Sequence, residues 1–405
     1  MRPSEVLFVT QFYRPELIGS APFNADLAEW LVGSGRQVTV LTGRPHYPTP
    51  EAFSEYRSAR SMREMFNGVV VERLGAWIPR RRSAGARVLG EAWFLLNGAV
   101  ALATGRIARH AVVLSLCPSI LSVALGTMAR MRDGRCVAIV HDIQSGLARG
   151  LGMVGPGWFG RMMQVCERLV LNRADLVVVL SKEMADELRR IGVTTPIEVV
   201  PIWVDTDHIQ PIAANAAGRM TLLYSGNLGK KQGLDQVIGL AAQLQAKRPE
   251  IDIVVRGTGS QATTLRATIA DRELRNVRVE ELLPERNFSE GLATGDIHLV
   301  PQDPSAAAFA VPSKAFSIMA AGRPFVATAG PGSSLWQLRE RSGAFLCVPP
   351  YDPAAFADAV LRLADDTALR ADLGRRGRQF VERHVAKHKV LSEFVTRLDA
   401  LCAHA

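Results

Sequence analysis

The sequence has few of the patterns that mark metal sites, disulfide frameworks or export. Its five cysteines are scattered through 405 residues, with no CxxC pair and no cysteine–histidine ligand spacing: Cys117, Cys136, Cys166, Cys347 and Cys402. Neither a zinc site nor a set of disulfides is expected, and a reducing cytoplasm is the natural location. The stretch VLFVTQFYRP near the amino terminus runs directly into a strand pattern, so we expect no signal peptide.

Long hydrophobic runs are also absent. The most apolar stretch, Val88 to Thr104, contains Glu91 and Asn97 and falls short of the roughly 20 residues that span a bilayer. We expect a buried or interfacial helix there. Together with the basic run Arg80-Arg81-Arg82 and Arg87, this helix suits peripheral contact with an anionic membrane at the inner face of the cell membrane. An ordinary core helix behind a basic loop explains the same pattern.

Two common nucleotide-binding motifs are missing as well. The sequence has no GxxxxGK[ST], and neither RGTGSQ nor GNLGKKQG matches GxGxxG in a first βα turn. Nicotinamide chemistry therefore loses its main support. The net charge of +9 and the pI near 9.7 suit nucleic acid, anionic lipid or phosphorylated small molecules equally well. The motifs below favour the last of these, and we expect no nucleic-acid partner.

Short apolar runs alternate with longer amphipathic runs along both halves of the chain. The first half contains EVLFVTQF, QVTVLTG, AVVLSL, RCVAIVHD and LVVVLS, and the second contains TLLYSGN, IDIVVRG, VRVEELL, DIHLVPQ and PFVATAG. This alternation is typical of parallel strands covered by helices, so we expect two doubly wound α/β domains facing a central cleft. A proline-containing linker falls at roughly 200 to 219, and the tail from Pro353 is helical.

Lysines precede two helix starts in the second half. VPSKAFSIMAAGRP places Lys314 in the first turn of a short helix, after Pro312-Ser313 as a plausible capping pair. LLYSGNLGKKQGLDQVI places Lys230 and Lys231 in a Gly-rich turn before another helix. Because helix amino termini already carry partial positive charge, the paired occurrence predicts a shared anion such as a phosphate or diphosphate. Solvated loop lysines are the ordinary alternative for either one alone.

The first half offers two weaker candidates. Gly19 and Ser20 lie between a strand and a helix, where backbone can approach a ligand closely, but Gly19 is also explained as a turn glycine. VAIVHDIQ ends a buried strand with His141, at the edge where parallel sheets bind ligands. A structural hydrogen-bonding role for His141 stays equally open.

The order of these motifs resembles glycosyltransferase family 4 along nearly the whole chain. YRPELIGSAPFNADLAEWL, VVVLSKEMADEL, VVPIWVDTDHIQP, LLYSGNLGKKQGLD, IDIVVRGTGS and VPSKAFSIMAAGRPFVATAGPGS carry the resemblance. It is most similar to the bacterial exopolysaccharide and O-antigen branch that includes the colanic acid biosynthesis glycosyltransferases. The resemblance implies a GT-B fold with an acceptor-side domain at 1–204, a nucleotide-sugar-binding domain at 205–385 and a carboxyl-terminal helix at 386–405 that packs back towards the first domain.

The resemblance also implies an activity: retaining, metal-independent transfer, of the hexosyltransferase type, from a nucleotide-diphosphate sugar to a growing cell-surface polysaccharide. We expect the acceptor to be an oligosaccharide or a polyprenyl-diphosphate-linked sugar, and the basic run and apolar helix described above suit the lipid-linked form. No cofactor is implied. Carried over by position, His141, Lys231 and Lys314 become candidate catalytic residues. The implied donor-binding set is Gly19, Ser20, Gly226, Asn227, Lys230, Gly257, Gly259, Leu283, Pro312, Ser313 and Ser317.

The sequence departs from the family pattern at several of these positions. Two glutamates that most members carry in the last motif are Phe309 and Ser317 here. The usual arginine and lysine of the phosphate turn are Asn227 and Gln232. Two other functions stay open. One is a nucleotide-sugar 2-epimerase of similar fold, which also has two α/β domains around a diphosphate, and the other is a non-catalytic nucleotide-sugar-binding subunit, which would explain the missing glutamates.

Overall fold

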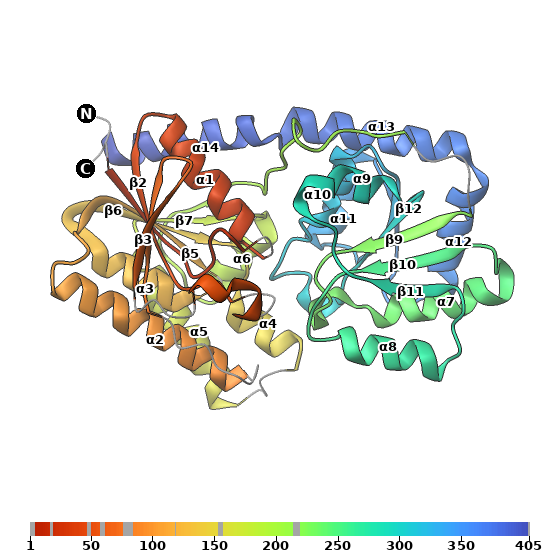
Figure 1. Ribbon diagram of the computed structural model, residues 1–405, viewed down its shortest axis with the longest axis horizontal. Coiled ribbons are helices and arrows are strands. Elements are labelled where there is room, and N and C mark those ends of the chain that lie inside the picture. The colour runs from red at the N-terminus through yellow and green to blue at the C-terminus, as the bar shows by residue number, and fades with distance from the viewer. Residues whose placement is uncertain are drawn as a thin grey trace. The chain divides into compact units, whose positions relative to one another are not determined.

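The chain forms two compact α/β units in a computed structural model (Figure 1). Unit 1 comprises Met1–Val200 with Leu391–Ala405, and unit 2 comprises Pro201–Val390. The structure describes residues 5–16, 19–46, 50–56, 61–75, 84–117, 119–152, 157–213 and 219–403. The basic run Arg80-Arg81-Arg82 lies outside the described residues, as does the Arg87 side chain. The domain limits expected at 204/205 and 385/386 stay a prediction.

Unit 1 contains an eight-stranded sheet in the order β3-β4-β2-β1-β5-β6-β7-β8. All neighbouring strands are parallel except the antiparallel pair β3 and β4. The strands are β1 (Glu5–Val9), β2 (Gln37–Thr42), β3 (Met62–Phe66), β4 (Val69–Arg73), β5 (His110–Cys117), β6 (Arg130–Val140), β7 (Leu176–Val179) and β8 (Ile197–Val199).

Helices connect and cover these strands, as the alternation predicts. They are α1 (Ala21–Gly33), the 3-10 segment η1 (Pro50–Tyr56), α2 (Ala84–Ala103), α3 (Ile120–Ala129), α4 (Gln144–Gly150), α5 (Trp158–Leu171) and α6 (Lys182–Arg190). A core cluster joins β1 and β5 to α2 and α3, with Phe94 and Leu125 among its buried members. The Val88–Thr104 stretch is thus a helix with one buried side.

Unit 2 contains a six-stranded, fully parallel sheet in the order β11-β10-β9-β12-β13-β14. Its strands are β9 (Thr221–Ser225), β10 (Asp252–Arg256), β11 (Val277–Glu280), β12 (Ile297–Pro301), β13 (Phe325–Thr328) and β14 (Leu346–Val348). Its helical segments are η2 (Lys230–Gln232), α7 (Asp235–Lys247), α8 (Ala262–Asp271), η3 (Glu285–Asn287), α9 (Phe288–Ala293), η4 (Pro304–Ala306), α10 (Lys314–Ala320), α11 (Ser334–Ser342), α12 (Pro353–Asp365) and α13 (Thr367–His384).

The last helix, α14 (Lys387–Ala403), contributes its carboxyl-terminal part to unit 1. Arg36, which is buried, pairs with Asp399, and Arg397 pairs with Glu198 at 3.1 Å. The carboxyl-terminal helix expected to pack towards the first domain is therefore present. Among the described residues, no helix is long and apolar enough to cross a membrane.

The sequence-based strand assignments are confirmed for ten of the described strands, and four strands were missed: β3, β4, β8 and β14. The short strands β8 and β14 have only three residues each. The β3–β4 hairpin turns at Asn67-Gly68, both with positive φ, which is the Asn-Gly signal of a tight hairpin. The antiparallel edge could therefore have been found from FNG alone.

The core of unit 2 predicts a large stability difference between two phenylalanines. Phe356 on α12 is 1% exposed among the hydrophobic core, whereas Phe288 at the start of α9 is 37% exposed. We expect Phe356→Ala to lower the free energy of unfolding by about 3–5 kcal/mol, because it leaves a cavity, and Phe288→Ala to cost about 1 kcal/mol or less. Urea denaturation of both variants measures this, and equal losses would contradict the core assignment.

Candidate functional site

The candidate site of unit 2 lies where three parallel strands end. β9 has β10 on one side and β12 on the other, because the chain runs outward from β9 to β10 and β11 and then crosses back to β12 on the far side of β9. Such a switch point in strand order opens space at the carboxyl edge of a parallel sheet. The turns after β9 and β10 both carry the glycines that the sequence singled out.

The turns after β9 and β10 touch through their backbones. The Gly226 amide donates a hydrogen bond to the Arg256 carbonyl at 2.9 Å. A Cβ on Gly257 would lie 1.9 Å from the Gly226 carbonyl oxygen, and Gly226 itself has a φ of 141°. Only glycine fits at Gly257 in this arrangement. The structure therefore brings these two predicted residues together.

Asn227 and Gly259 join the same contact. The Leu228 amide donates to the Thr258 carbonyl at 2.8 Å, and a Cβ on Gly259 would lie 2.6 Å from Asn227 Oδ1. The Tyr224 hydroxyl donates a hydrogen bond to the Asn227 carbonyl at 2.7 Å and so holds the turn after β9. Four of the predicted donor-binding residues, Gly226, Asn227, Gly257 and Gly259, thus lie together in two turns that contact each other.

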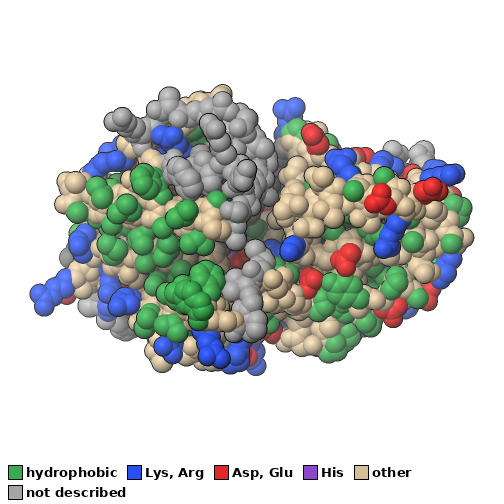
Figure 2. All heavy atoms as spheres, turned by 90° about the horizontal axis from the view of Figure 1, so that it is seen from below, with side chains coloured by type: hydrophobic (Ala, Val, Ile, Leu, Met, Phe, Trp, Pro, Cys, Tyr) green, Lys and Arg blue, Asp and Glu red, His purple; other side chains and the backbone are tan. Residues whose placement is uncertain are grey.

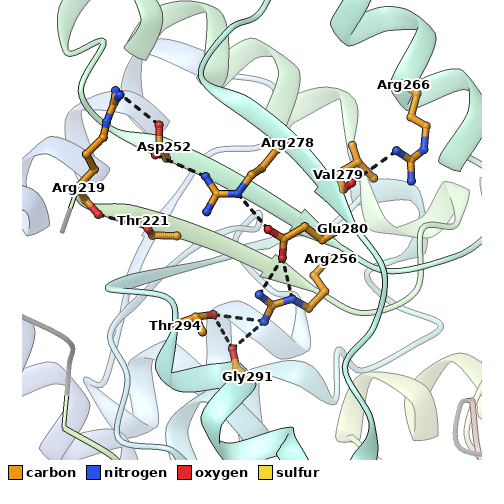
Figure 3. Close-up of polar contacts among 10 residues, drawn as sticks. All are labelled: Arg219, Thr221, Asp252, Arg256, Arg266, Arg278, Val279, Glu280, Gly291 and Thr294. Atoms are coloured by element: carbon orange, nitrogen blue, oxygen red, sulfur yellow. Dashed lines mark hydrogen bonds and ion pairs between the residues drawn. The ribbon is translucent and has the colours of Figure 1, made fainter. Parts of the chain in front are cut away.

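A buried arginine, Arg256, lies directly before the Gly257 turn and holds β10 to the neighbouring segments (Figure 3). Arg256 at the end of β10 pairs with Glu280 at 2.9 Å and donates to the Gly291 carbonyl at 2.9 Å. Burial opposes ionisation of Glu280, but hydrogen bonds from Arg256 and Arg278 outweigh it and hold the pKa of Glu280 below its usual range. A Cβ on Gly291 would lie 3.0 Å from Leu283, which is 44% exposed and so accessible to a ligand.

Lys314 begins α10 and its amino group reaches the turn after β9. Its Nζ donates to Gln232 Oε1 at 2.9 Å and lies 3.8 Å from the centre of the Tyr224 ring. A Cβ on Gly226 would lie 3.5 Å from this nitrogen. Sequence reasoning missed Tyr224 as the lysine's support, although a tyrosine at the end of a buried strand beside a Gly-rich turn was visible.

The helix start itself differs from the expectation. Ser313 occupies the N-cap position, but its side chain makes no capping hydrogen bond, so the predicted capping role is wrong. Pro312 accepts a backbone hydrogen bond from Ala315, and Ser317 lies one turn into α10. The hydroxyl of Ser313 is therefore not committed to closing the helix end.

Two cations approach each other at this site. Part of the Lys314 side chain reaches solvent, yet protein atoms surround its amine, and this burial lowers its pKa well below 10.5. The positive charge of Lys231, in η2, lowers the pKa further. Lys230 in the same segment is exposed. An anion beside Lys231 and Lys314 would relieve their repulsion, so the geometry suits a phosphate or diphosphate.

A polar cluster after β12 escaped the sequence analysis. The Tyr351 amide donates to Gln236 Oε1 at 3.0 Å, and its hydroxyl donates to Asp303 Oδ2 at 2.8 Å. The Asp303 amide in turn donates to the Lys231 carbonyl at 3.2 Å. Tyr351 has a φ of 59°, an unusual conformation for a residue other than glycine. This cluster ties the lysine-bearing turn to the ends of β12 and β14.

The unit 1 candidates also lie close to one another. Gly19 has a φ of 69°, and a Cβ added there would meet no atom within 4 Å, so its backbone conformation, rather than crowding, calls for glycine. Ser20 occupies the N-cap position of α1. His141 follows β6 and lies edge-on to Phe23 of α1, with ring centres 6.0 Å apart. The start of α1 and the end of β6 thus meet at one edge of the unit 1 sheet.

The described residues contain no group of three or more His, Cys, Asp or Glu side chains suited to hold a metal ion. The sequence has one Asp-x-Asp tripeptide, Asp205-Thr206-Asp207. Asp205 accepts from the His208 amide at 2.9 Å and pairs with Lys387 at 3.1 Å. This tripeptide therefore forms a capped turn beside α14.

Because the pKa of Lys314 is lowered, replacing this lysine with an uncharged residue is expected to stabilise the native protein. Because the unfolded chain binds more protons between the folded-state pKa and 10.5, the stability of the native protein rises with pH across that window. Methionine lacks this dependence. We expect Lys314→Met to raise the thermal midpoint, and more at about pH 6 than at about pH 9.

The matched control is Lys230→Met, since Lys230 is exposed on the neighbouring segment. We expect it to change the midpoint little at either pH. A Lys314→Met protein that is less stable than the wild type at both pH values would show that the amine's hydrogen bond and ring contact outweigh its desolvation.

Comparison with known proteins assigns both units. Residues 19–203 match a glycosyl transferase 4-like domain, and residues 205–380 match the glycosyl transferases group 1 domain. The putative colanic acid biosynthesis glycosyl transferase WcaI of Escherichia coli strain K12 is 28% identical over 400 residues, covering 95% of this chain and 97% of that protein.

Several solved structures have a fold similar to that of this chain. Sucrose-phosphate synthase from Thermosynechococcus elongatus superposes with a TM-score of 0.80 at 18% identity, covering 99% of this chain and 100% of that one. Anabaena HepE, in complex with UDP and glucose, gives 0.72 at 13% identity, covering 98% and 99%. The predicted GT-B fold class is confirmed. The chain is a glycosyltransferase, formed by a glycosyl transferase 4-like domain followed by a glycosyl transferases group 1 domain.

Proposed function

We propose that this glycosyltransferase moves a sugar, with retention and without a metal, from a nucleotide-diphosphate donor to a growing, lipid-linked cell-surface polysaccharide. The observation that carries the proposal is the approach of Lys231 and Lys314 beside the glycine turn at the switch point of unit 2. Its relatives give support: WcaI is named for colanic acid biosynthesis, and HepE binds UDP and glucose.

The two lysines would act on the leaving group. Breaking the bond from sugar C1 to phosphate builds negative charge on the diphosphate, which preorganised cations stabilise without waiting for solvent. Gly226 and Gly257 let backbone approach the diphosphate closely, and Leu283 offers an apolar surface for the base. Loss of one cation then costs on the order of 3 kcal/mol in the barrier, about a hundredfold in rate.

Positive charge on Lys231 and Lys314 would take the place of a metal at the diphosphate. The departing phosphate, on the same face of the sugar as the incoming hydroxyl, would deprotonate the acceptor, so no separate enzyme base is needed. Ser313, whose hydroxyl is not used as a cap, and Ser317 are candidates to contact the sugar in place of the two glutamates of the family pattern. Gly19, Ser20 and His141 would serve the acceptor and the transferred sugar from unit 1.

A lipid-linked acceptor implies that the enzyme acts at the inner face of the cell membrane, in exopolysaccharide or lipopolysaccharide biosynthesis. Peripheral attachment of the protein belongs to this proposal. The alternatives, a 2-epimerase and a non-catalytic nucleotide-sugar-binding subunit, differ from it in a measurable way: neither transfers a sugar to an acceptor.

Donor binding is tested by thermal shift with UDP, GDP, ADP, TDP and their common sugars. We expect one nucleoside diphosphate to stabilise the wild type, and Lys231→Ala and Lys314→Ala to lose most of that shift, because each removes a cation from the diphosphate. Lys247→Ala is the control, since Lys247 is an exposed lysine at the end of α7. No shift with any nucleotide would refute the diphosphate site.

Transfer is tested by turnover with the donor so identified and lipid-linked acceptors. We expect activity to persist in EDTA, to yield product of the donor's anomeric configuration by NMR, and to fall about a hundredfold in Lys231→Ala. His141→Ala should lose turnover while keeping the nucleotide shift. Activity that EDTA abolishes and Mg²⁺ restores would overturn metal independence, and donor binding without transfer to any acceptor would favour the non-catalytic alternative.

A further inference from the structure

A wide apolar surface covers one side of unit 1 (Figure 2). Eleven large hydrophobic side chains on α2, α3 and α5 are exposed, and we call this set the apolar face. They are Val88, Leu89, Trp93, Leu96 and Val100 on α2, Met128 on α3, and Trp158, Phe159, Met162, Val165 and Leu169 on α5. Exposed hydrophobic residues scattered singly need no explanation, but a continuous set of this size marks an interaction site.

The same spacing produces the face on both long helices. Leu89, Trp93, Leu96 and Val100 follow one another at i, i+4, i+7 and i+11, and so do Trp158, Met162, Val165 and Leu169. Such a stripe ordinarily faces the protein core. Here the core side of α2 is already supplied by other residues, Phe94 and Ala101, while Gly98 packs against Leu125 of α3. The outward stripes therefore have no structural role within the described part of unit 1.

The acidic residues of these helices point inward. Glu91 on α2 is buried and accepts a hydrogen bond from Ser119 at 2.9 Å. Glu167 on α5 is buried and accepts from Ser145 and from the Gln144 amide. As far as their side chains are described, α2, α3 and α5 expose no carboxylate.

The exposed charges beside the face are mainly positive. Arg161 is exposed on α5, and exposed arginines follow the ends of α2, α3 and α5 in the chain: Arg106, Arg109, Arg132 and Arg173. One exposed acid, Asp133, accompanies Arg132. Figure 2 shows the same division, with hydrophobic side chains gathered on this side of unit 1 and basic ones around them.

We propose that the apolar face of α2, α3 and α5 docks on an anionic lipid bilayer. The combination of Trp93 and Trp158 with a cationic margin matches the chemistry of a membrane interface, where tryptophan settles at headgroup level and arginine pairs with lipid phosphate. A second copy of the chain fits worse, because a symmetric pairing would bring like-charged margins together. This inference rests on the peripheral attachment included in the proposed function, and it names the surface that would make the attachment. Lipid binding by this surface does not require donor binding in unit 2.

Vesicle flotation of the full-length protein tests the proposal. We expect the wild type to float with phosphatidylcholine–phosphatidylglycerol vesicles at low salt, and to bind vesicles of phosphatidylcholine alone far less. Leu96→Glu and Val165→Glu should each reduce the bound fraction on the order of tenfold, because they place a charge in the face. Met65→Glu is the matched control, since Met65 is 70% exposed on β3, outside the face.

Three results would overturn the proposal. The first is a wild-type protein that does not bind anionic vesicles at low salt, and the second is a pair of face variants that bind vesicles as well as Met65→Glu does. The third is a dimer that Leu96→Glu dissociates without changing flotation, which would assign the face to contact with a second copy of the chain. Light scattering after size exclusion measures that last case. The nucleotide thermal shift of each variant, expected to be unchanged, shows that the protein is folded and keeps failure here distinct from failure of the donor site.

Discussion

The parallel pairing of β9 with both β10 and β12 is the constraint on which the site of unit 2 depends. Parallel strands all end at one edge, so the turns that follow them meet there whatever their separation in sequence. Gly226 and Gly257 can then touch through backbone, and Lys314 on α10 can reach Gln232, which lies 82 positions earlier in the chain. A residue with a Cβ at Gly257 would force these turns apart.

The charge of Lys314 at this edge is unfavourable for stability. Desolvation and the nearby Lys231 both disfavour the protonated form of Lys314, while the Tyr224 ring and the Gln232 oxygen partly compensate. A protein selected for stability alone would place an apolar side chain there. A buried cation that lowers stability until an anion neutralises it is typical of functional sites.

Unit 1 is also built on a mostly parallel sheet covered by helices, but its surface differs. Its helices α2 and α5 bury their carboxylates and expose their hydrophobic stripes, the reverse of the arrangement expected for helices that face water. Burial of Glu91 and Glu167 is tolerated because serine hydroxyls and a backbone amide supply hydrogen bonds. The lysines proposed to bind the diphosphate lie in unit 2 and this face lies in unit 1, so each can be altered without changing the other.

By itself, the sequence determined the α/β architecture, most strands and the family, since hydrophobic period, glycine placement and motif order are local properties. It also pointed to Lys231 and Lys314, because a lysine before a helix start is visible in a short window. Only the tertiary structure decided that Tyr224 supports Lys314, that Ser313 does not cap α10, that Tyr351 and Asp303 brace the turn, and that the stripes of α2 and α5 form one exposed face. Each of these depends on which residues from distant segments come together, and a local pattern carries no information about its partner across the fold.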